Sequence, residues 1–111
     1  HTPASTSNIL LIEWKASFSV SVSGNLITAL FQDQITPTAD SIDTDIDYLF
    51  AGSMVTKHGK VQMTAGTVSE IGFSLRSGMS SAGTTYFNTL AGTPLFGDSL
   101  NSYIRITEYQ P

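Results

Sequence analysis

Residues 8–22 read NILLIEWKASFSVSV, and the alternation within this stretch decides the fold of the chain. From Leu10 to Val22 every even position is apolar, while the odd positions from Glu13 onward are charged residues or serines. Successive side chains of a strand point to opposite faces, so a period of two is typical of a strand with one buried face. We therefore expect the even face to lie on a core and the serine face to meet water or a polar partner.

The length of this strand sets a second expectation. Thirteen residues from Leu10 to Val22 would extend about 40 Å, whereas a compact domain of this chain length is roughly 35 Å across. The strand should therefore bend, contain a bulge, or begin outside the main core. Ile9 and Leu11 are apolar on the otherwise polar face, and they favour a start outside the core or a second covered surface.

The rest of the chain carries short alternating segments separated by turn residues. They are residues 26–31, 40–50, 54–63, 68–76, 84–90 and 100–109. About eight strands without a helical period predict an all-β fold, an antiparallel β-sandwich or jelly-roll. The 111 residues predict a single domain over 8–111, preceded by a linker or frayed terminus over 1–7.

Turn signals predict how neighbouring strands connect. Ser23, Gly24 and Asn25 suit a turn between the first strand and the second, so these two strands are expected to form a hairpin. His58 and Gly59 predict a second hairpin centred within 54–63, with His58 exposed at its tip. Within 68–76 a change of apolar parity predicts a bulge near residues 69–72.

The predicted core combines the even face of the first strand with the apolar positions of later strands. It contains Leu10, Ile12, Trp14, Phe18, Val20, Phe73, Ile104 and Ile106. Phe31, Phe50 and Phe87 are also expected inside, whereas Tyr86, Tyr103 and Tyr109 suit a surface or an interface.

The strongest chemical signal is a run of aspartates. Asp40, Asp43, Asp45 and Asp47 fall within eight residues, and as part of a strand the last three would share one face. Clustered carboxylates repel one another, and a hard cation such as Ca²⁺ relieves that repulsion. An EF-hand is excluded because Tyr48 replaces the turn glycine. A calcium-binding loop and a solvated acidic strand both remain open.

Composition excludes several classes of function. A net charge of −4 with five Lys and Arg argues against nucleic-acid binding, which needs a basic patch. No apolar run approaches the ~20 residues that span a bilayer, so no membrane insertion is expected. The chain has no cysteine and none of the common hydrolase or nucleotide-binding motifs, so no enzymatic activity is predicted.

One stretch resembles a known family. Residues 9–17, ILLIEWKAS, are similar to the final shell strand of tombusvirus-like and nodavirus-like coat proteins, where an apolar-x-apolar-Glu-aromatic run leads to a projecting domain. Leu10, Ile12, Glu13 and Trp14 match that pattern. The Ser- and Thr-rich β unit that follows is similar to their protruding domains in size and texture. By this resemblance residues 9–15 belong either to the shell or to the protruding domain.

The resemblance implies a spike on the surface of a virion, made in the host cytoplasm. Such a domain would form a homodimer, contact neighbouring coat-protein subunits, and present loops to a host-cell receptor or glycan. The rival interpretation is a carbohydrate-binding or adhesin-type β-sandwich, including C1q-like trimers. Both functions need a rigid scaffold with functional loops. Oligomeric state separates them, because the capsid spike should dimerise and the C1q-like module should trimerise.

Overall fold

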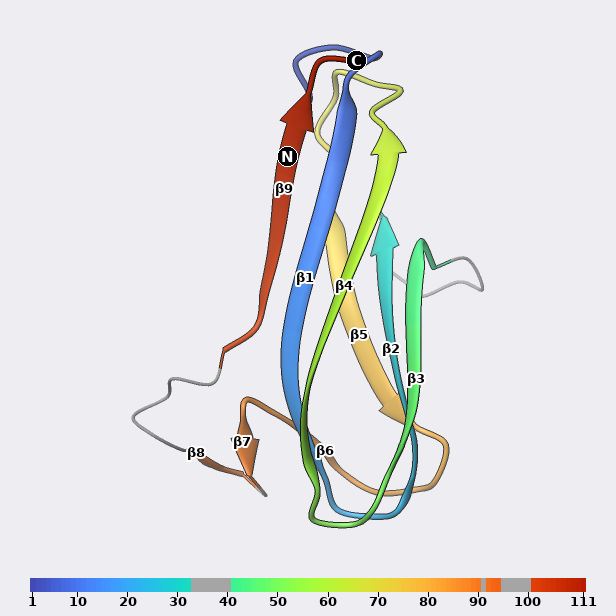
Figure 1. Cartoon of the computed structure of the whole chain (residues 1–111), viewed down its shortest axis with the longest axis vertical. Coiled ribbons are helices and arrows are strands. Elements are labelled where there is room, and N and C mark those ends of the chain that lie inside the picture. The colour runs from blue at the N-terminus through green and yellow to red at the C-terminus, as the bar shows by residue number, and fades with distance from the viewer. Residues whose placement is uncertain (33–40, 91, 95–100) are drawn as a thin grey trace.

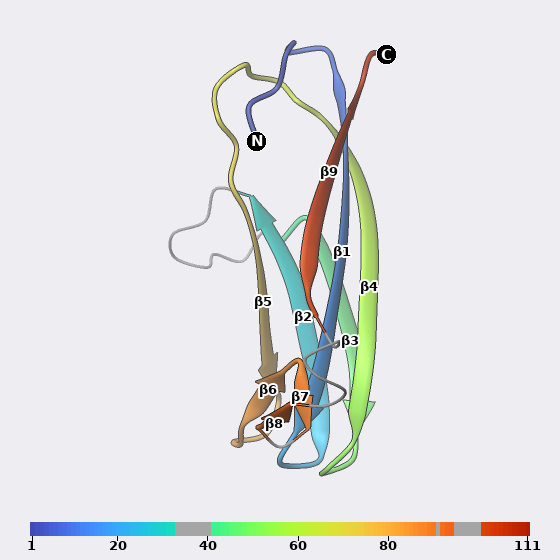
Figure 2. The same cartoon turned by 90° about the vertical axis from the view of Figure 1, so that its left-hand side faces the viewer.

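The computed structural model describes residues 1–32, 41–90, 92–94 and 101–111. Within these residues the chain is all β: two antiparallel sheets, A and B, pack face to face, and the two short strands β7 and β8 pair as a separate third sheet (Figures 1 and 2). The strands are β1 (Ile9–Val20), β2 (Gly24–Gln32), β3 (Asp43–Leu49), β4 (Met54–Thr64), β5 (Phe73–Met79), β6 (Thr85–Phe87), β7 (Thr89–Leu90), β8 (Thr93–Pro94) and β9 (Tyr103–Tyr109). This arrangement confirms the predicted antiparallel β-sandwich; it does not confirm the more specific jelly-roll.

Sheet A is built around β1. Strand β4 pairs with one edge of β1 from residue 9 to 19. Strand β9 pairs with the other edge over residues 9–15, and β6 continues that edge over residues 18–20. Strand β1 is therefore hydrogen bonded along both edges, and its even face is buried, as the alternation predicts.

Sheet B has the order β3-β2-β5. The chain passes between the sheets at residues 21–23, 50–53, 65–72 and 80–84, so β1 and β2 lie in different sheets. The predicted β1–β2 hairpin is therefore wrong. Each of these strands has one apolar face, and placing them in opposite layers lets Phe18 of β1 and Leu26 of β2 meet in one buried cluster.

The core consists of two clusters along the length of the sandwich. Leu10, Ile12 and Trp14 belong to the first, and Phe18 and Val20 belong to the second. The other predicted core residues are partly buried against the first cluster: Phe73, Ile104 and Ile106. Trp14 and Phe18 lie on the same side of sheet A, and Trp14 is only 1% exposed.

The second predicted hairpin, within residues 54–63, is also wrong, because β4 runs unbroken from Met54 to Thr64. Gly59 is the direct partner of Trp14 in the register of β1 and β4. A Cβ atom on Gly59 would lie 2.2 Å from the indole Nε1 of Trp14. The glycine therefore makes room for the indole rather than for a turn. His58 is an exposed mid-strand residue of β4, not a tip residue.

The long β1 strand fits without a break because the body is elongated, with a longest extent of 45 Å. At the end that carries both termini, sheet A projects beyond sheet B (Figures 1 and 2). The connection over residues 65–72 folds back there and buries Ala65 and Ile71 against Leu10 and Ile12. Ile71 lies in this connection, and β5 begins only at Phe73, so the strand predicted over 68–76 starts later and extends to Met79.

The polar face of β1 is partly covered within the chain. Ser17 and Ser19 are each 1% exposed. The hydroxyls of Ser17 and Thr56 are hydrogen bonded at 2.9 Å, and the hydroxyl of Ser19 donates to the carbonyl of Thr89 in β7 at 2.7 Å. The strand predicted over 84–90 is divided into β6 and β7 by Asn88, which has a positive φ of 59°. The serine face thus meets a polar partner from its own chain.

Residues 1–7 lie against the same end of the sandwich. The amino group of His1 donates to the carbonyl of Ile71 at 3.0 Å. Glu108 of β9 accepts from the backbone N–H of Ala4 at 2.8 Å and from the side chain of Asn8 at 2.6 Å. The hydrogen bond from Asn8 lowers the pKa of the Glu108 carboxyl below its ordinary value. These contacts hold the segment that the sequence predicts as a linker or frayed terminus.

Candidate functional site

The aspartates of β3 lie on the face of this edge strand that is turned toward the other sheet, and they are partly exposed there. Asp43, Asp45 and Asp47 share one face of β3, as the parity predicts. Asp43 accepts a hydrogen bond from the indole Nε1 of Trp14 at 2.9 Å. This contact joins sheet B to sheet A through the largest side chain of the core. The side chains of Asp45 and Asp47 are still 37% and 44% exposed, so the interpretation of these residues as a solvated acidic strand stays a prediction.

Lys57 of β4 forms ion pairs with the other two aspartates. Its ammonium group donates to Asp47 Oδ2 at 2.6 Å and lies 3.5 Å from Asp45 Oδ2. The hydrogen bond from Lys57 lowers the pKa of the Asp47 carboxyl, and the same bond raises the pKa of Lys57. Strands β3 and β4 are edge strands that lie beside each other, so this ion pair closes one side of the sandwich.

The calcium site stays a prediction. Asp40, its first proposed ligand, lies outside the described residues. Each of the other three has a protein partner in Trp14 or Lys57. Among the residues that the structure describes, no group of three or more acidic or histidine side chains is arranged to hold a metal ion.

Because the aspartates lie on the inward face of β3, the apolar residues that alternate with them point outward. Ile46, Tyr48 and Phe50 are 63%, 55% and 70% exposed, and Ile27 of β2 is 38% exposed. Ile27 and Ile46 are direct cross-strand partners, and the rings of Tyr48 and Phe50 pack edge to face with centroids 5.5 Å apart. We call these four residues the apolar face. Phe50, expected in the core, is thus one of its most exposed members; Phe87 is also exposed rather than buried.

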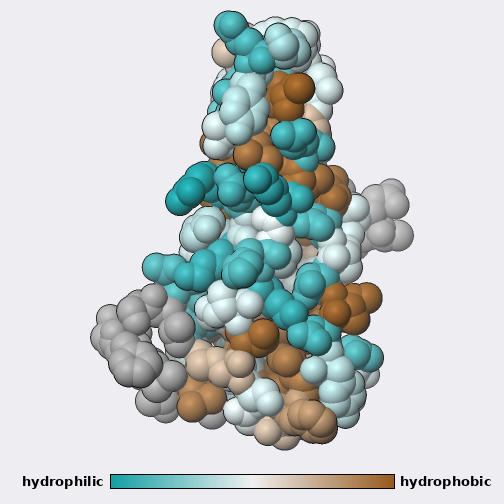
Figure 3. Space-filling view, in the orientation of Figure 1, coloured by the Kyte–Doolittle hydropathy of each residue, from teal (hydrophilic) through white to brown (hydrophobic). Residues whose placement is uncertain are grey.

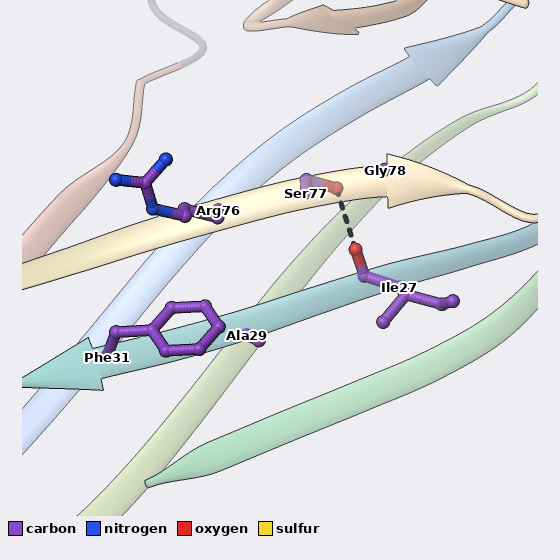
Figure 4. Close-up of a pocket in the computed structure, with 6 residues that line it drawn as sticks. All are labelled: Ile27, Ala29, Phe31, Arg76, Ser77 and Gly78. Atoms are coloured by element: carbon purple, nitrogen blue, oxygen red, sulfur yellow. Dashed lines mark hydrogen bonds between the residues drawn. The ribbon is translucent and has the colours of Figure 1, made fainter. Parts of the chain in front are cut away.

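A shallow hollow of about 370 Å³ continues the apolar face toward β5. Figure 4 shows its lining, in which the aromatic ring of Phe31 and the guanidinium of Arg76 stand on neighbouring strands. The hydroxyl of Ser77 donates to the carbonyl of Ile27 at 3.1 Å and ties the two strands together. No atom lies within 4 Å of the place where a Cβ on Gly78 would sit, so there is free space for a side chain beside Gly78.

The outer face of sheet A has the opposite character. In its middle, Lys60 and Arg105 flank Glu13 as direct cross-strand partners, and His58 and Tyr103 flank Lys15 in the same way. Arg105 lies over the ring of Tyr103, 5.2 Å from its centroid. Figure 3 faces this sheet and shows hydrophilic side chains across its middle.

Sequence reasoning found the two faces of β3 but missed which one is exposed. The signal that could have found it is Lys57, because an inward-facing lysine needs a carboxylate partner.

None of the described residues forms a helix long and apolar enough to cross a membrane. Comparison of the chain with protein-family models and with curated proteins gives no match.

Proposed function

We propose that this chain is a self-associating interaction domain that pairs with a second copy of itself through the apolar face of sheet B. The observation that carries the proposal is the exposure of Ile46, Tyr48 and Phe50 beside Ile27 on one sheet surface. Contiguous exposed apolar residues mark interaction sites, and aromatic side chains are enriched at the centres of interfaces. Single exposed apolar residues would need no such explanation.

The charge of this surface supports a second copy as the partner. All outward-facing described residues of β2 and β3 are neutral, because the three aspartates of β3 point inward. A two-fold axis places the same surface patch on both sides of an interface. The four residues of the apolar face therefore meet their own copy without burying like charges, and the charged Arg76 lies beside them at the hollow.

The hollow beside the apolar face offers a place for an anchor residue of the second copy. Interfaces gain most of their binding energy from a few aromatic or arginine side chains that fill pockets on the partner. Tyr48 and Phe50 are the exposed aromatics on this surface, and the hollow lies on the same sheet next to Ile27. In a symmetric dimer each copy would supply both the anchor and the hollow.

More specifically, we propose that the chain is a capsid protruding domain that forms dimeric spikes and presents loops to host cells. The resemblance of residues 9–17 to a coat-protein strand and the β-sandwich architecture support this form. Its test is electron microscopy of particles from the full gene product. Icosahedral shells with two-fold protrusions are expected; a gene product that forms no particle contradicts the capsid role.

Sedimentation equilibrium tests self-association directly. A weak interface of less than about 1,200 Å² is expected to give dimers only at high protein concentration. The wild type should dimerise below ~1 mM, whereas the double variant Ile46→Ser, Tyr48→Ser should remain monomeric. Val68→Ser is the matched control, because Val68 is 56% exposed but lies outside the apolar face, and it should dimerise like the wild type.

A second variant tests the anchor. Gly78→Leu fills the hollow from its floor, where a Cβ meets no atom within 4 Å, so the fold should tolerate it while dimerisation weakens. Wild-type protein that remains monomeric near 1 mM, or a double variant that still dimerises, contradicts the proposed face. A trimer favours the C1q-like alternative over the dimeric spike.

A further inference from the structure

The outer face of sheet A concentrates positive charge in an acidic chain. Lys15, Lys60 and Arg105 are three of the five Lys and Arg in the sequence. They lie with His58, Glu13 and Tyr103 in two adjacent cross-strand rows, and we call these six residues the cationic strip. With His58 neutral, the strip has a net charge of +2, whereas the whole chain has −4.

Folding itself produces this separation of charge. Among the described residues, Glu13 is the only carboxylate on the outer face of sheet A. The three aspartates of β3 lie on the face of sheet B that is turned toward sheet A, where Lys57 and Trp14 contact them, and Glu108 contacts the N-terminal segment. The described acids of β3 and β9 thus lie off the outer face of sheet A, and the strip keeps a net positive charge although it contains Glu13.

From this arrangement we infer that the cationic strip binds an anionic polysaccharide, one that bears sulfate or carboxylate groups on its sugars. Strands are about 4.8 Å apart and residues on one face are about 7 Å apart along a strand, so the three cations cover a patch roughly 10 Å wide. Flexible Lys and Arg side chains on an open sheet suit a linear polymer with separated charges better than a single small anion.

Three further features of the surface fit sugars. Tyr103 is 41% exposed and offers a ring on which a sugar can stack. Glu13 lies between Lys60 and Arg105, where its carboxylate can accept hydrogen bonds from sugar hydroxyls. At one end of the strip a second hollow of about 280 Å³ is lined by Ile9, Gln62, Met63 and Thr64, and the side chains of Gln62 and Thr64 can form hydrogen bonds with hydroxyl groups.

A nucleic acid fits the same surface less well. Duplex DNA carries one charge per about 1.7 Å of its axis, and tight binding needs a dense set of cations. The central carboxylate of Glu13 would repel such a backbone, while it can serve a polymer rich in hydroxyl groups. The inference rests on the outer face of sheet A alone, so it is independent of self-association through sheet B.

The test compares two arginines that lie in different sheets, Arg105 in sheet A and Arg76 in sheet B. Arg105 and Arg76 are both exposed, and each lies on the outer face of its own sheet. Binding of heparin oligosaccharides and of polygalacturonate is measured by calorimetry at about 50 mM salt, where charge contacts are weakly screened. Arg105→Gln should weaken binding about tenfold and flatten the dependence of log Kd on log salt, because fewer counterions are released. Arg76→Gln, with the same change of charge, should stay within about twofold of the wild type when both are measured at a protein concentration where the chain is monomeric.

The two polymers separate sulfate from carboxylate recognition, and binding of either supports the inference. Far-UV circular dichroism confirms that each variant is folded, so a loss of affinity reports the surface itself. Three results overturn the inference: no binding of either polymer, equal losses for Arg105→Gln and Arg76→Gln, or duplex DNA that binds as tightly as the polysaccharides.

Discussion

Strands β1 and β3 both alternate polar and apolar residues, but β1 turns its apolar residues inward whereas β3 turns its polar residues inward. In β1 the apolar residues face the core and the polar residues face outward. In β3 the aspartates face the other sheet, while Ile46 and Tyr48 are exposed. A period of two shows that a strand has two different faces, but it does not show which face is inside.

The partners inside the sandwich decide the orientation of β3. Asp43 accepts a hydrogen bond from the buried indole of Trp14, and Asp47 accepts one from Lys57. Buried polar donors without partners cost about 1–3 kcal/mol each. Turning β3 over would leave both donors unpaired, whereas the exposed apolar side chains would be covered in the proposed pairing with a second copy. The comparison thus connects an inward ion pair to the exposed apolar face that we propose as an interaction surface.

The largest effect is expected at Trp14, where the two strands meet. Trp14→Ala removes a fully buried side chain and should lower the free energy of unfolding by about 3–5 kcal/mol. Trp14→Phe keeps most of the volume but leaves Asp43 without its donor, so a smaller loss of about 1–3 kcal/mol is expected. Urea unfolding followed by circular dichroism measures both. A loss below about 1 kcal/mol for Trp14→Ala, or free quenching of the wild-type fluorescence by iodide, would show that the indole is not in the core.

Two glycine-to-alanine variants test the contact between Trp14 and β4 more specifically. In Gly59→Ala the new Cβ would lie 2.2 Å from Trp14 Nε1 and 2.4 Å from Asp43 Oδ2. The contact between the sheets must shift, and we expect a loss of about 1–3 kcal/mol. Gly78→Ala is the matched control in a strand of sheet B, because its Cβ meets no atom within 4 Å. Equal thermal stability of the two variants would contradict the close approach of the indole to β4.

These residues also show how far the sequence alone could go. The alternation of residues 10–22 predicts the buried face of β1 because apolar burial dominates there. Gly59 looks like a turn residue, since a local pattern cannot show that an indole 45 positions earlier needs its space. The orientation of β3 likewise depends on Lys57 and Trp14, which become neighbours of the aspartates only when the two sheets pack. The apolar face was therefore not predictable from β3 itself.

The ion pair at the edge of the sandwich predicts a dependence of stability on pH. Lys57 lowers the pKa of Asp47, so this stabilisation is present above the ordinary aspartate pKa of 3.8 and is lost as the pH falls through the lower folded value. The pKa of Lys57 is raised, so the contribution of Lys57 to stability is present below pH 10.5 and is lost as the pH rises through the higher folded value. The stability difference between the wild type and Lys57→Met should therefore be largest near neutral pH and shrink at both extremes. A difference that does not change from about pH 3 to pH 8 would exclude the pair as its source.

The most direct test of the opposite orientations makes the same substitution in both strands. Ile12→Thr in β1 places a hydroxyl at a position that is 0% exposed, and it should cost at least about 2 kcal/mol. Ile46→Thr in β3 changes a side chain that is 63% exposed and keeps a β-branched residue, so its effect should stay within about 0.5 kcal/mol. Both are measured by urea unfolding at a concentration where the protein is monomeric. A large loss for Ile12→Thr with almost none for Ile46→Thr is the predicted result; similar losses for the two would contradict an outward apolar face on β3.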